Sequence, residues 1–274
     1  MKYPKTPAVF VKGKDFQLAD VDPDANTPFT DKYVDKDAAG PRMAALRQRL
    51  AELQEKLYAE HQRSLLLVFQ ATDTGGKDGA IGNLLMGVNP AGVQVAAFKE
   101  PTPKELAHDF LWRIHAQTPE QGHIGVFNRS HYEDVLVTRV HGLIDKKKAH
   151  QRFEDINNFE QLLVRNGTVI IKFFLYISKK EQAERLQVRL DDPAKRWKFE
   201  PSDLKERARW NDYQDVYEDA LRHCSSPEAP WFVVPANHKW SRDLAIAEIV
   251  VATLEEMHPE PPAAKFDVEA QVIK

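Results

Sequence analysis

The sequence has a single cysteine, Cys224, among its 274 residues, so the chain cannot form an internal disulfide. A lone thiol is typical of a protein from a reducing compartment. No apolar run approaches the ~20 residues that a membrane-spanning helix needs, and the first residues lead into no signal-peptide stretch. These absences exclude a disulfide-stabilised scaffold and a membrane span, and we expect a cytoplasmic protein.

The sequence also lacks a large excess of either positive or negative side chains. The chain carries 38 basic and 41 acidic side chains, which gives a net charge of −3 and excludes a basic protein that coats nucleic acid. Hydrophobic residues make up 42% and charged residues 29% of the chain, which argues against disorder. What remains is a globular enzyme or binding module, large enough to bury a sizeable core.

The distribution of proline and glycine divides the chain into three parts. Residues 1–40 show little periodicity, so we expect an N-terminal arm that is ordered only where it packs on the core. Residues 259–274 contain three prolines and little pattern, and they are predicted to form a C-terminal tail. Residues 41–258 are predicted to form the folded domain.

The domain is predicted to open with a helix that begins at Pro41, because proline fits the first helical turn. Four leucines then recur on one face of that helix: Leu46, Leu50, Leu53 and Leu57. This spacing favours a surface helix that packs on the core. A short dimer contact is the alternative, since fewer than three heptads are present.

Five short apolar runs, rich in β-branched and aromatic residues, are predicted to form strands. They span residues 65–69, 93–98, 124–127, 169–177 and 231–234. Segments with helical spacing lie at residues 104–116, 147–164, 181–190, 204–221 and 243–257. Strands that alternate with helices indicate a three-layer αβα fold, in which helices bury both faces of a five-stranded parallel sheet.

A glycine-rich turn follows the first predicted strand. It reads Thr74-Gly75-Gly76-Lys77-Asp78-Gly79, and a helix is predicted to begin within it. Main-chain N–H groups in such a turn surround a phosphate, the helix N-terminus adds its dipole, and Lys77 adds a positive charge. The match to the motif G-x-x-x-x-G-K-[ST] is imperfect, since Ala71 replaces the first glycine and Asp78 the final Ser or Thr. We predict a phosphate site at residues 74–79, with a merely structural turn as the alternative.

Asp73 lies inside this turn and is predicted to hold a metal ion. The hydroxyl that contacts magnesium in the usual motif is missing after Lys77, so another group must hold the cation. A carboxylate placed here would repel phosphate unless a cation lay between them. The alternative is a turn in which Asp73 bonds its own backbone, and the two roles are compatible.

Polar side chains also follow the predicted strand at residues 124–127. Asn128, Arg129 and Ser130 come first, and Glu133 and Asp134 follow. Groups at the carboxyl end of a parallel strand point into the ligand crevice of an open α/β sheet. Arg129 is suited to bridge phosphate oxygens, and Glu133 or Asp134 could supply a second metal carboxylate. The alternative is a capping box, in which Ser130 and Glu133 cap the next helix.

Residues 185–209 carry eight basic side chains against five acidic ones, a local excess of three in a chain of net charge −3. Asp192-Pro193 interrupts the helical pattern, so two helices joined by a short tip are predicted. One interpretation is a solvated helical hairpin. The local positive charge favours another, a lid that closes over bound phosphates and excludes water.

The chain resembles the type-2 polyphosphate kinases over roughly residues 40–257. It carries five motifs of that family, and they follow one another in the family's order. They are Thr72-Asp73-Thr74-Gly75-Gly76-Lys77-Asp78-Gly79, Phe127-Asn128-Arg129-Ser130, Asp192-Pro193-Ala194-Lys195-Arg196-Trp197-Lys198, Trp210-Asn211-Asp212-Tyr213, and Ala229-Pro230-Trp231 with Ala236-Asn237-His238-Lys239-Trp240-Ser241-Arg242. The resemblance implies a P-loop kinase fold with a helical lid at about residues 185–209. It also implies Mg²⁺-dependent transfer of phosphoryl groups between inorganic polyphosphate and the adenine nucleotides AMP, ADP and ATP.

The resemblance carries site roles to matching positions of this chain. Asp73, Lys77 and Arg129 match the family's loop aspartate, loop lysine and strand-end arginine, and Asn128 and Arg129 are expected at the nucleotide. Phosphate contacts from the lid are expected from its basic residues Arg185, Arg189 and Lys198. Homodimers or homotetramers are suggested as well.

The chain departs from the family's pattern after Arg129. Part of the family has an aspartate where this chain has Asn128, and many members have a glutamate where it has Thr138. We therefore expect Glu133 to supply the missing metal carboxylate beside Asp73. This variant pattern resembles the branch of the family that accepts both AMP and ADP.

Two other classes of function stay open. A P-loop nucleoside or nucleotide kinase would take its phosphoryl group from ATP. A non-catalytic module would only bind a polyanion, but the pair Asp73 and Lys77 argues against an inactive loop. The sequence contains no recognised nucleic-acid motif, and we expect neither a nucleic-acid nor a membrane partner.

Overall fold

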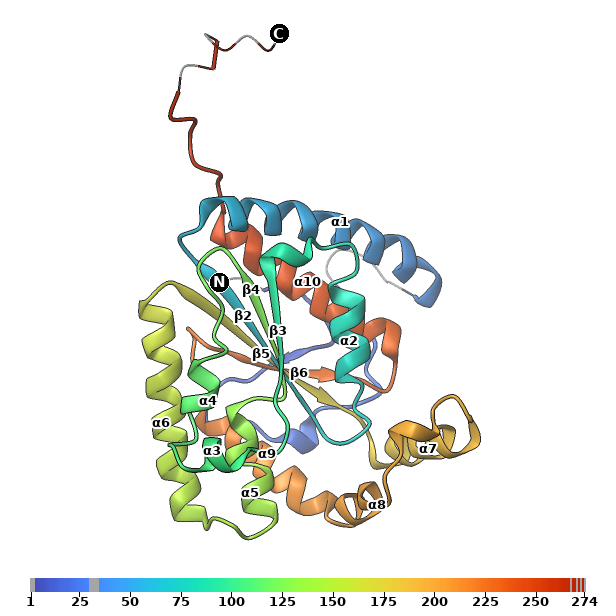
Figure 1. Cartoon of the computed structure of the whole chain (residues 1–274). Coiled ribbons are helices and arrows are strands. Elements are labelled where there is room, and N and C mark those ends of the chain that lie inside the picture. The colour runs from blue at the N-terminus through green and yellow to red at the C-terminus, as the bar shows by residue number, and fades with distance from the viewer. Residues whose placement is uncertain (1–2, 30–34, 267, 270, 272, 274) are drawn as a thin grey trace.

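The computed structural model describes residues 3–29, 35–266, 268, 269, 271 and 273. Its centre is a six-stranded sheet with the strand order β1-β6-β5-β2-β4-β3 (Figure 1). The strands are β1 (Val9–Phe10), β2 (Ser64–Ala71), β3 (Val93–Ala97), β4 (Ile124–Asn128), β5 (Thr168–Tyr176) and β6 (Trp231–Pro235). Strands β2 to β6 pair in parallel, and each coincides with a predicted run. Both faces of β2 are buried, which explains its continuous apolar sequence.

The prediction of five strands was wrong by one, because the N-terminal arm contributes β1. This strand pairs antiparallel with β6, with Val9 opposite Val233 and Phe10 opposite Phe232. The rings of Phe10 and Phe232 meet edge to face with their centroids 5.4 Å apart. Apolar burial of this kind offsets the entropy lost when the arm is ordered. The sheet is therefore mixed rather than wholly parallel.

Helices form the other two layers, on either face of the sheet (Figure 1). The α-helices are α1 (Lys36–Glu60), α2 (Lys77–Leu84), α3 (Pro103–Leu106), α4 (Trp112–His115), α5 (Val137–Val140), α6 (Lys146–Arg165), α7 (Lys179–Asp191), α8 (Pro201–Ala208), α9 (Trp210–His223) and α10 (Lys239–Met257). Short 3₁₀ helices are η1 (Leu18–Asp20), η2 (Pro90–Gly92), η3 (His131–Asp134) and η4 (Arg196–Lys198). Helices α1, α2 and α10 share one apolar core with the sheet, and α6 and α9 share a second. The three-layer αβα prediction is confirmed.

Helix α1 begins before its predicted start at Pro41. The side chain of Asp35 caps it by accepting a hydrogen bond from the N–H of Ala38 at 2.8 Å. Pro41 therefore lies inside the helix, where the carbonyl that loses its partner belongs to the exposed residue Asp37. The predicted leucine face is confirmed, because Leu50, Leu53 and Leu57 are buried and α1 packs along α10.

Two of the predicted helices are each divided in two. Residues 104–116 contain α3 and α4, and residues 204–221 contain most of α8 and α9. A capping box starts α3, but after it the side chain of Asp109 accepts a hydrogen bond from the N–H of Leu111 at 3.0 Å. Such local bonds compete with helical ones, and the apolar spacing continues across the break.

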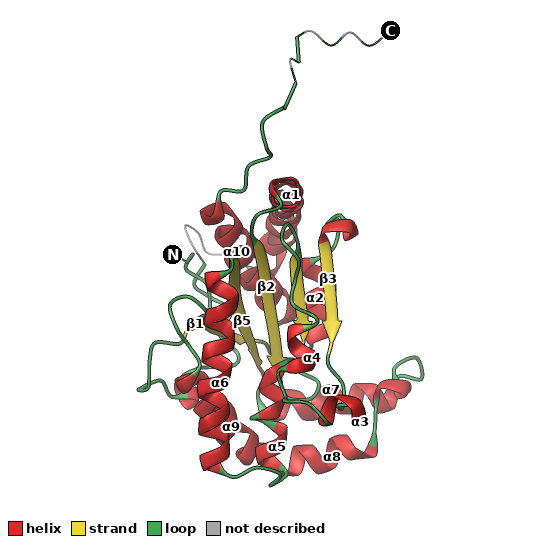
Figure 2. Cartoon of the chain, turned by 60° about the vertical axis from the view of Figure 1, so that its left-hand side comes forward, coloured by secondary structure: helices red, strands yellow, loops and turns green. Residues whose placement is uncertain are grey.

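The carboxyl ends of the parallel strands lie at one edge of the sheet. In Figure 2 the arrowheads of the strands point to this edge, and α3, α7 and α8 lie beyond it. Open α/β sheets bind ligands at this edge, so the fold brings the loops after β2 and β4 to the expected place. No helix among the described residues is long and apolar enough to cross a membrane.

Candidate active site

The glycine-rich turn joins β2 directly to α2. The N–H of Gly75 donates to the carbonyl of Thr72 at 3.0 Å, and α2 begins at Lys77 with Gly76 as its N-cap. Gly76 has a φ of 92°, and Thr74, with a φ of 62°, takes the left-handed conformation although it is not a glycine. Backbone strain of this kind is typical of ligand-binding loops, and the N-terminus of α2 faces the space where an anion would sit.

Close packing requires glycine at two of these positions. A Cβ atom at Gly75 would lie 2.4 Å from the Cβ of Ala71, and one at Gly76 would lie 2.3 Å from Nη1 of Arg242. Side chains at either position would displace the turn or the arginine. The sequence of the turn is therefore set by its close approach to the strand end and to α10.

Four predicted catalytic side chains meet beside this turn: Asp73, Lys77, Arg129 and Glu133, here called the charged cluster. Asp73 and Lys77 follow β2, whereas Arg129 and Glu133 follow its neighbour β4. Nη2 of Arg129 lies 3.7 Å from Oδ1 of Asp73, with side-chain exposures of 45% and 30%. Asp73 and Arg129 are thus accessible to a ligand, although the catalytic role of each member of the cluster stays a prediction.

Opposite charges balance one another within the charged cluster. Burial lowers the pKa of Lys77, and the neighbouring Arg129 lowers it further. Glu133 and Asp73 raise it, but by less. Burial raises the pKa of Glu133, although Arg129 and Lys77 oppose the rise. Burial alone would lower the pKa of Arg129, but Glu133 and Asp73 raise it overall. An arriving anion and its cation would enter a site already arranged for both signs of charge.

The two carboxylates of the charged cluster fit a hard divalent cation. Mg²⁺ takes oxygen ligands, and it commonly binds one or two carboxylates together with substrate phosphates and water. Asp73 contributes to the raised pKa of Glu133 by repulsion, which a cation between the two carboxylates would relieve. The pair Asp73 and Glu133 therefore has suitable donor chemistry, and its metal role stays a prediction.

Ser130 caps the segment that carries Glu133, but the two do not act as one capping box. The hydroxyl of Ser130 accepts hydrogen bonds from the N–H of Tyr132 and from Nε2 of Gln70, both at 3.2 Å. Glu133 instead accepts from Gln70 and interacts with Arg129 and Lys77. Its carboxylate is thus directed to the charged cluster, as the metal hypothesis requires.

Asn128 lies at the carboxyl end of β4 and contacts the phosphate loop. Its Nδ2 donates to Oδ1 of Asp78 at 2.6 Å. Asp78 is the residue that stands in place of the Ser or Thr of the usual motif, and it is exposed at the start of α2. This bond links the start of α2 to the end of β4, while a contact of Asn128 with nucleotide stays a prediction.

Arg185 of α7 joins the lid to the phosphate loop. Its guanidinium donates to Oε1 of Glu181 at 2.7 Å, to the carbonyl of Thr74 at 3.0 Å and to the carbonyl of Ala236 at 2.6 Å. The predicted lid residue thus holds the main chain of the loop. Direct contact of Arg185 with phosphate stays a prediction.

Arg189 and Lys198 lie together on the lid, farther from the loop. Nη1 of Arg189 donates to the carbonyl of Lys198 at 2.9 Å and lies 3.5 Å from Oδ2 of Asp203. Burial raises the pKa of Asp203, and repulsion from Asp73 raises it further, so this part of the predicted lid lies near Asp73. Phosphate binding by these two cations stays a prediction.

Three residues that support the site had no assigned role from the sequence. Arg242 on α10 is 2% exposed and lies behind the loop glycines. Gln70 is buried and bonds to Ser130 and Glu133. Gln182 donates to the carbonyl of Asp73 at 3.1 Å. Arg242 falls within a motif of the sequence resemblance, which was the one available signal. Nothing in local periodicity indicates that these side chains reach the loop.

A buried polar network anchors η3 beneath the site. Nζ of Lys172, on β5, donates to the carboxylate of Glu160, to the hydroxyl of Tyr132 at 2.9 Å and to the carbonyl of Cys224 at 2.6 Å. His131 Nε2 lies 3.2 Å from Oε1 of Glu160. His131 and Tyr132 lie between Arg129 and Glu133 in the sequence, so the network fixes the segment that supplies both side chains.

Replacement of Lys172 by methionine is expected to destabilise the chain strongly, because it leaves the Glu160 carboxylate buried without its cation. The cost should be about 3–5 kcal/mol of unfolding free energy. The double variant Lys172→Met/Glu160→Gln should recover most of that loss, since it removes both charges. Urea unfolding curves of the two variants test this. Equal destabilisation by both would contradict a charge penalty and indicate lost packing instead.

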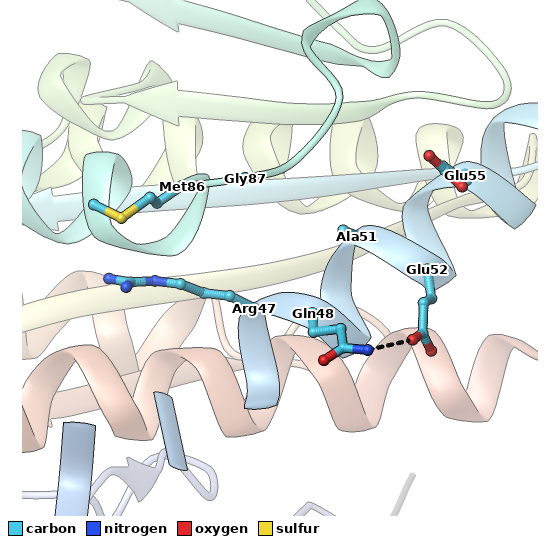
Figure 3. Close-up of a pocket in the computed structure, with 7 residues that line it drawn as sticks. All are labelled: Arg47, Gln48, Ala51, Glu52, Glu55, Met86 and Gly87. Carbon is cyan, nitrogen blue, oxygen red and sulfur yellow. Dashed lines mark hydrogen bonds between the residues drawn. The ribbon is translucent and has the colours of Figure 1, made fainter. Parts of the chain in front are cut away.

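A hollow of about 420 Å³ lies elsewhere, between α1 and the loop after α2 (Figure 3). Arg47, Gln48, Glu52 and Met86 are among the residues that line it. None of its lining residues belongs to the phosphate loop or to the segment after β4. It is therefore separate from the candidate active site.

Comparison with known proteins agrees with the resemblance found in the sequence. The family model described as polyphosphate kinase 2 (PPK2) matches residues 33–262. The chain is 50% identical over 252 residues to an AMP/ADP-polyphosphate phosphotransferase of Meiothermus ruber, covering 91% of this chain and 93% of that protein. It is 46% identical over 233 residues to an ADP-polyphosphate phosphotransferase of Rhodopseudomonas palustris, covering 80% and 81%.

A solved structure agrees with these sequence matches. The crystal structure of polyphosphate kinase 2 from Arthrobacter aurescens superposes with a TM-score of 0.93 at 46% identity, covering 98% of this chain and 96% of that one. The similarity thus includes the phosphate loop, the segment after β4 and the lid. The chain belongs to the polyphosphate kinase 2 family.

Proposed function

We propose that the protein transfers phosphoryl groups between inorganic polyphosphate and adenine nucleotides, converting AMP to ADP and ADP to ATP. The observation that carries the proposal is the charged cluster, where two carboxylates and two cations adjoin a main-chain phosphate loop. The named activities of the Meiothermus ruber and Rhodopseudomonas palustris relatives support the same reaction. The first of these supports acceptance of both AMP and ADP.

The chemistry is an in-line displacement at phosphorus, in which positioning and electrostatics supply most of the catalysis. An oxygen of the acceptor phosphate attacks the terminal phosphorus of the donor, and the bond to the donor's bridging oxygen breaks. The loop amides and Lys77 hold phosphate oxygens, while Arg129 and the lid cations offset the charge that develops on the transferred group. Asp73 and Glu133 would hold Mg²⁺, which supplies further positive charge to the phosphate oxygens when bound.

A substrate panel tests the proposal. The chain is incubated with Mg²⁺, long-chain polyphosphate and one of AMP, ADP, GMP or GDP, and products are separated by chromatography. Formation of ADP from AMP and of ATP from ADP, with no other nucleotide donor, is expected. An ATP-dependent nucleoside or nucleotide kinase would make neither product from polyphosphate, and a polyanion-binding module would retain polyphosphate without turnover. Either result would overturn the proposal.

The pH dependence of kcat/KM should reflect the charged cluster. Because the pKa of Glu133 is raised, this carboxylate gains a proton, and the rate falls, at a higher pH than for an ordinary glutamate. Because the pKa of Lys77 is lowered, its positive charge is lost earlier as pH rises. Higher Mg²⁺ should move the acid limb to lower pH, since the cation competes with the proton. An acid limb that persists unchanged in Glu133→Gln would assign it to the substrate phosphates instead.

We propose a homodimer or homotetramer as the assembled form, and size-exclusion chromatography with light scattering tests it. This proposal rests on the family resemblance rather than on a contact surface. A monomer at working concentration would contradict it without affecting the proposed reaction.

A further inference from the structure

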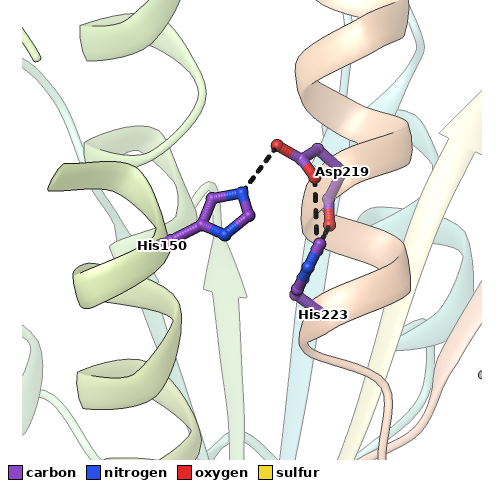
Figure 4. Close-up of side chains that lie close together, drawn as sticks. All are labelled: His150, Asp219 and His223. Atoms are coloured by element: carbon purple, nitrogen blue, oxygen red, sulfur yellow. Dashed lines mark hydrogen bonds and ion pairs between the residues drawn. The ribbon is translucent and has the colours of Figure 1, made fainter. Parts of the chain in front are cut away.

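A second group of metal-ligand side chains lies away from the charged cluster, between α6 and α9. His150 comes from α6, and Asp219 and His223 come from α9, with both imidazole rings directed toward the carboxylate (Figure 4). One ligand atom from each residue lies within 4.8 Å of the other two. His223 follows Asp219 by one helical turn, a spacing that places two side chains on one helix face.

Each imidazole nitrogen lies about as far from a carboxylate oxygen of Asp219 as neighbouring ligands do in a tetrahedral metal site. Nε2 of His150 lies 3.5 Å from Oδ2 of Asp219, and Nδ1 of His223 lies 3.2 Å from Oδ1 of Asp219. In a tetrahedron with metal–ligand bonds of about 2.0–2.1 Å, neighbouring ligand atoms are separated by about 3.3 Å. Because the two imidazoles contact different oxygens of Asp219, the rings and the carboxylate must rotate to bring three ligand atoms around one cation.

His150 is only weakly held in this group of side chains. Among the described residues, its buried Nε2 makes no hydrogen bond, and its contact with Oδ2 of Asp219 is long, at 3.5 Å. The ring as a whole is 40% exposed, which leaves a path for an ion from solvent. A weakly held imidazole nitrogen and an open approach from solvent suit a metal ligand.

The surroundings hold the other two residues in place. Arg139 donates to Oδ2 of Asp219, and Phe153 stacks on the ring of His223 with centroids 5.3 Å apart. Outer contacts of this kind orient metal ligands, although the positive charge of Arg139 also weakens cation binding.

We propose that His150, Asp219 and His223 form a second metal site, specific for a transition-metal ion such as Zn²⁺ with water as the fourth ligand. Two imidazoles and one carboxylate suit Zn²⁺ or Co²⁺, whereas Mg²⁺ prefers oxygen ligands. Binding requires Nδ1 of His223 to release its 2.8 Å hydrogen bond to the carbonyl of Asp219. A bound ion would join α6 to α9, the helix whose Tyr217 interacts with Glu133.

Titration with Co²⁺ tests the site, because tetrahedral Co²⁺ absorbs visible light and reports its own coordination. Excess Mg²⁺ is present throughout to occupy the charged cluster. We expect one Co²⁺ per chain, displaced by Zn²⁺. His150→Phe and His223→Phe should each weaken binding at least about tenfold, and phenylalanine keeps the ring packing of these positions. The matched control is His108→Gln, a surface histidine stacked on Trp112, which should bind Co²⁺ unchanged.

Circular dichroism and thermal unfolding verify that the variants are folded before titration. Absence of stoichiometric Co²⁺ binding to the unmodified chain would overturn the site. Equal binding by the parent and both phenylalanine variants would do so too. Co²⁺ binding that disappears in Asp73→Asn but persists in the phenylalanine variants would place the ion at the charged cluster and contradict a second site.

Discussion

The variant Asp73→Asn is expected to lose nearly all turnover while it folds normally. Asparagine keeps the shape of the side chain and an oxygen for the turn, but it removes the charge that would hold Mg²⁺ and pair with Arg129. Loss of a metal ligand should cost several kcal/mol of transition-state stabilisation, or about a thousandfold in kcat. Stability should change little, because the pair with Arg129 is partly exposed and such pairs contribute at most about 1 kcal/mol.

Initial rates of ATP formation from ADP and polyphosphate, measured over a range of Mg²⁺ up to saturation, test this expectation. Thermal unfolding of the same samples verifies the fold. The matched control is Asp155→Asn, which removes an exposed carboxylate on α6 and should leave both rate and stability unchanged. Near-normal turnover of Asp73→Asn at saturating Mg²⁺ would remove Asp73 from the metal site.

The variant Glu133→Gln is expected to be far more damaging to the rate than Ser130→Ala. Glutamine can still bond to Gln70, but it cannot supply the second carboxylate that the cation needs. We expect a fall in kcat of about 10²–10³-fold. Its stability should be retained, since the change removes a carboxylate that burial disfavours in its charged form.

Ser130→Ala separates the two roles that the sequence left open for this segment. It removes the cap on η3 and the acceptor for Gln70, at a cost of about 1 kcal/mol of stability, but leaves the carboxylate of Glu133 in place. Rates of both variants are compared at saturating Mg²⁺ alongside urea unfolding. If Glu133→Gln costs as little turnover as Ser130→Ala, the segment serves only to cap a helix.

The sequence predicted best those elements whose residue pattern is continuous along the chain and several residues long. The apolar run of β2 and the glycine-rich turn after it specify a buried strand, a sharp turn and a helix start within one short segment. The neighbouring positions of Asp73 and Arg129 then follow, because residues after adjacent parallel strands meet at one edge. The strand, the turn and the helix start need no knowledge of distant contacts, whereas the meeting of Asp73 with Arg129 also needs the pairing of β2 with β4.

The elements that escaped prediction depend on contacts between distant parts of the chain. The two residues of β1 are too few to show a period, and they form a strand only because β6 offers an unpaired edge. Helix α1 starts after its N-cap, Asp35. The sequence also offered Pro41 as a start signal, and the predicted start was therefore placed too late. Arg242 reaches Gly76 from a helix far along the chain, so its place behind the loop is a property of the fold.

The contacts of Arg185 have a consequence for how the lid and the loop respond to substrate. Its guanidinium is held in place by carbonyls of the loop and of the segment after β6, so little of its rotational freedom remains to be lost when an anion arrives. A phosphate would also attract the guanidinium by its negative charge, which a neutral carbonyl does not. If residues 185–209 act as the predicted lid, phosphate in the loop and the position of α7 would be thermodynamically linked, because Arg185 contacts the loop from α7.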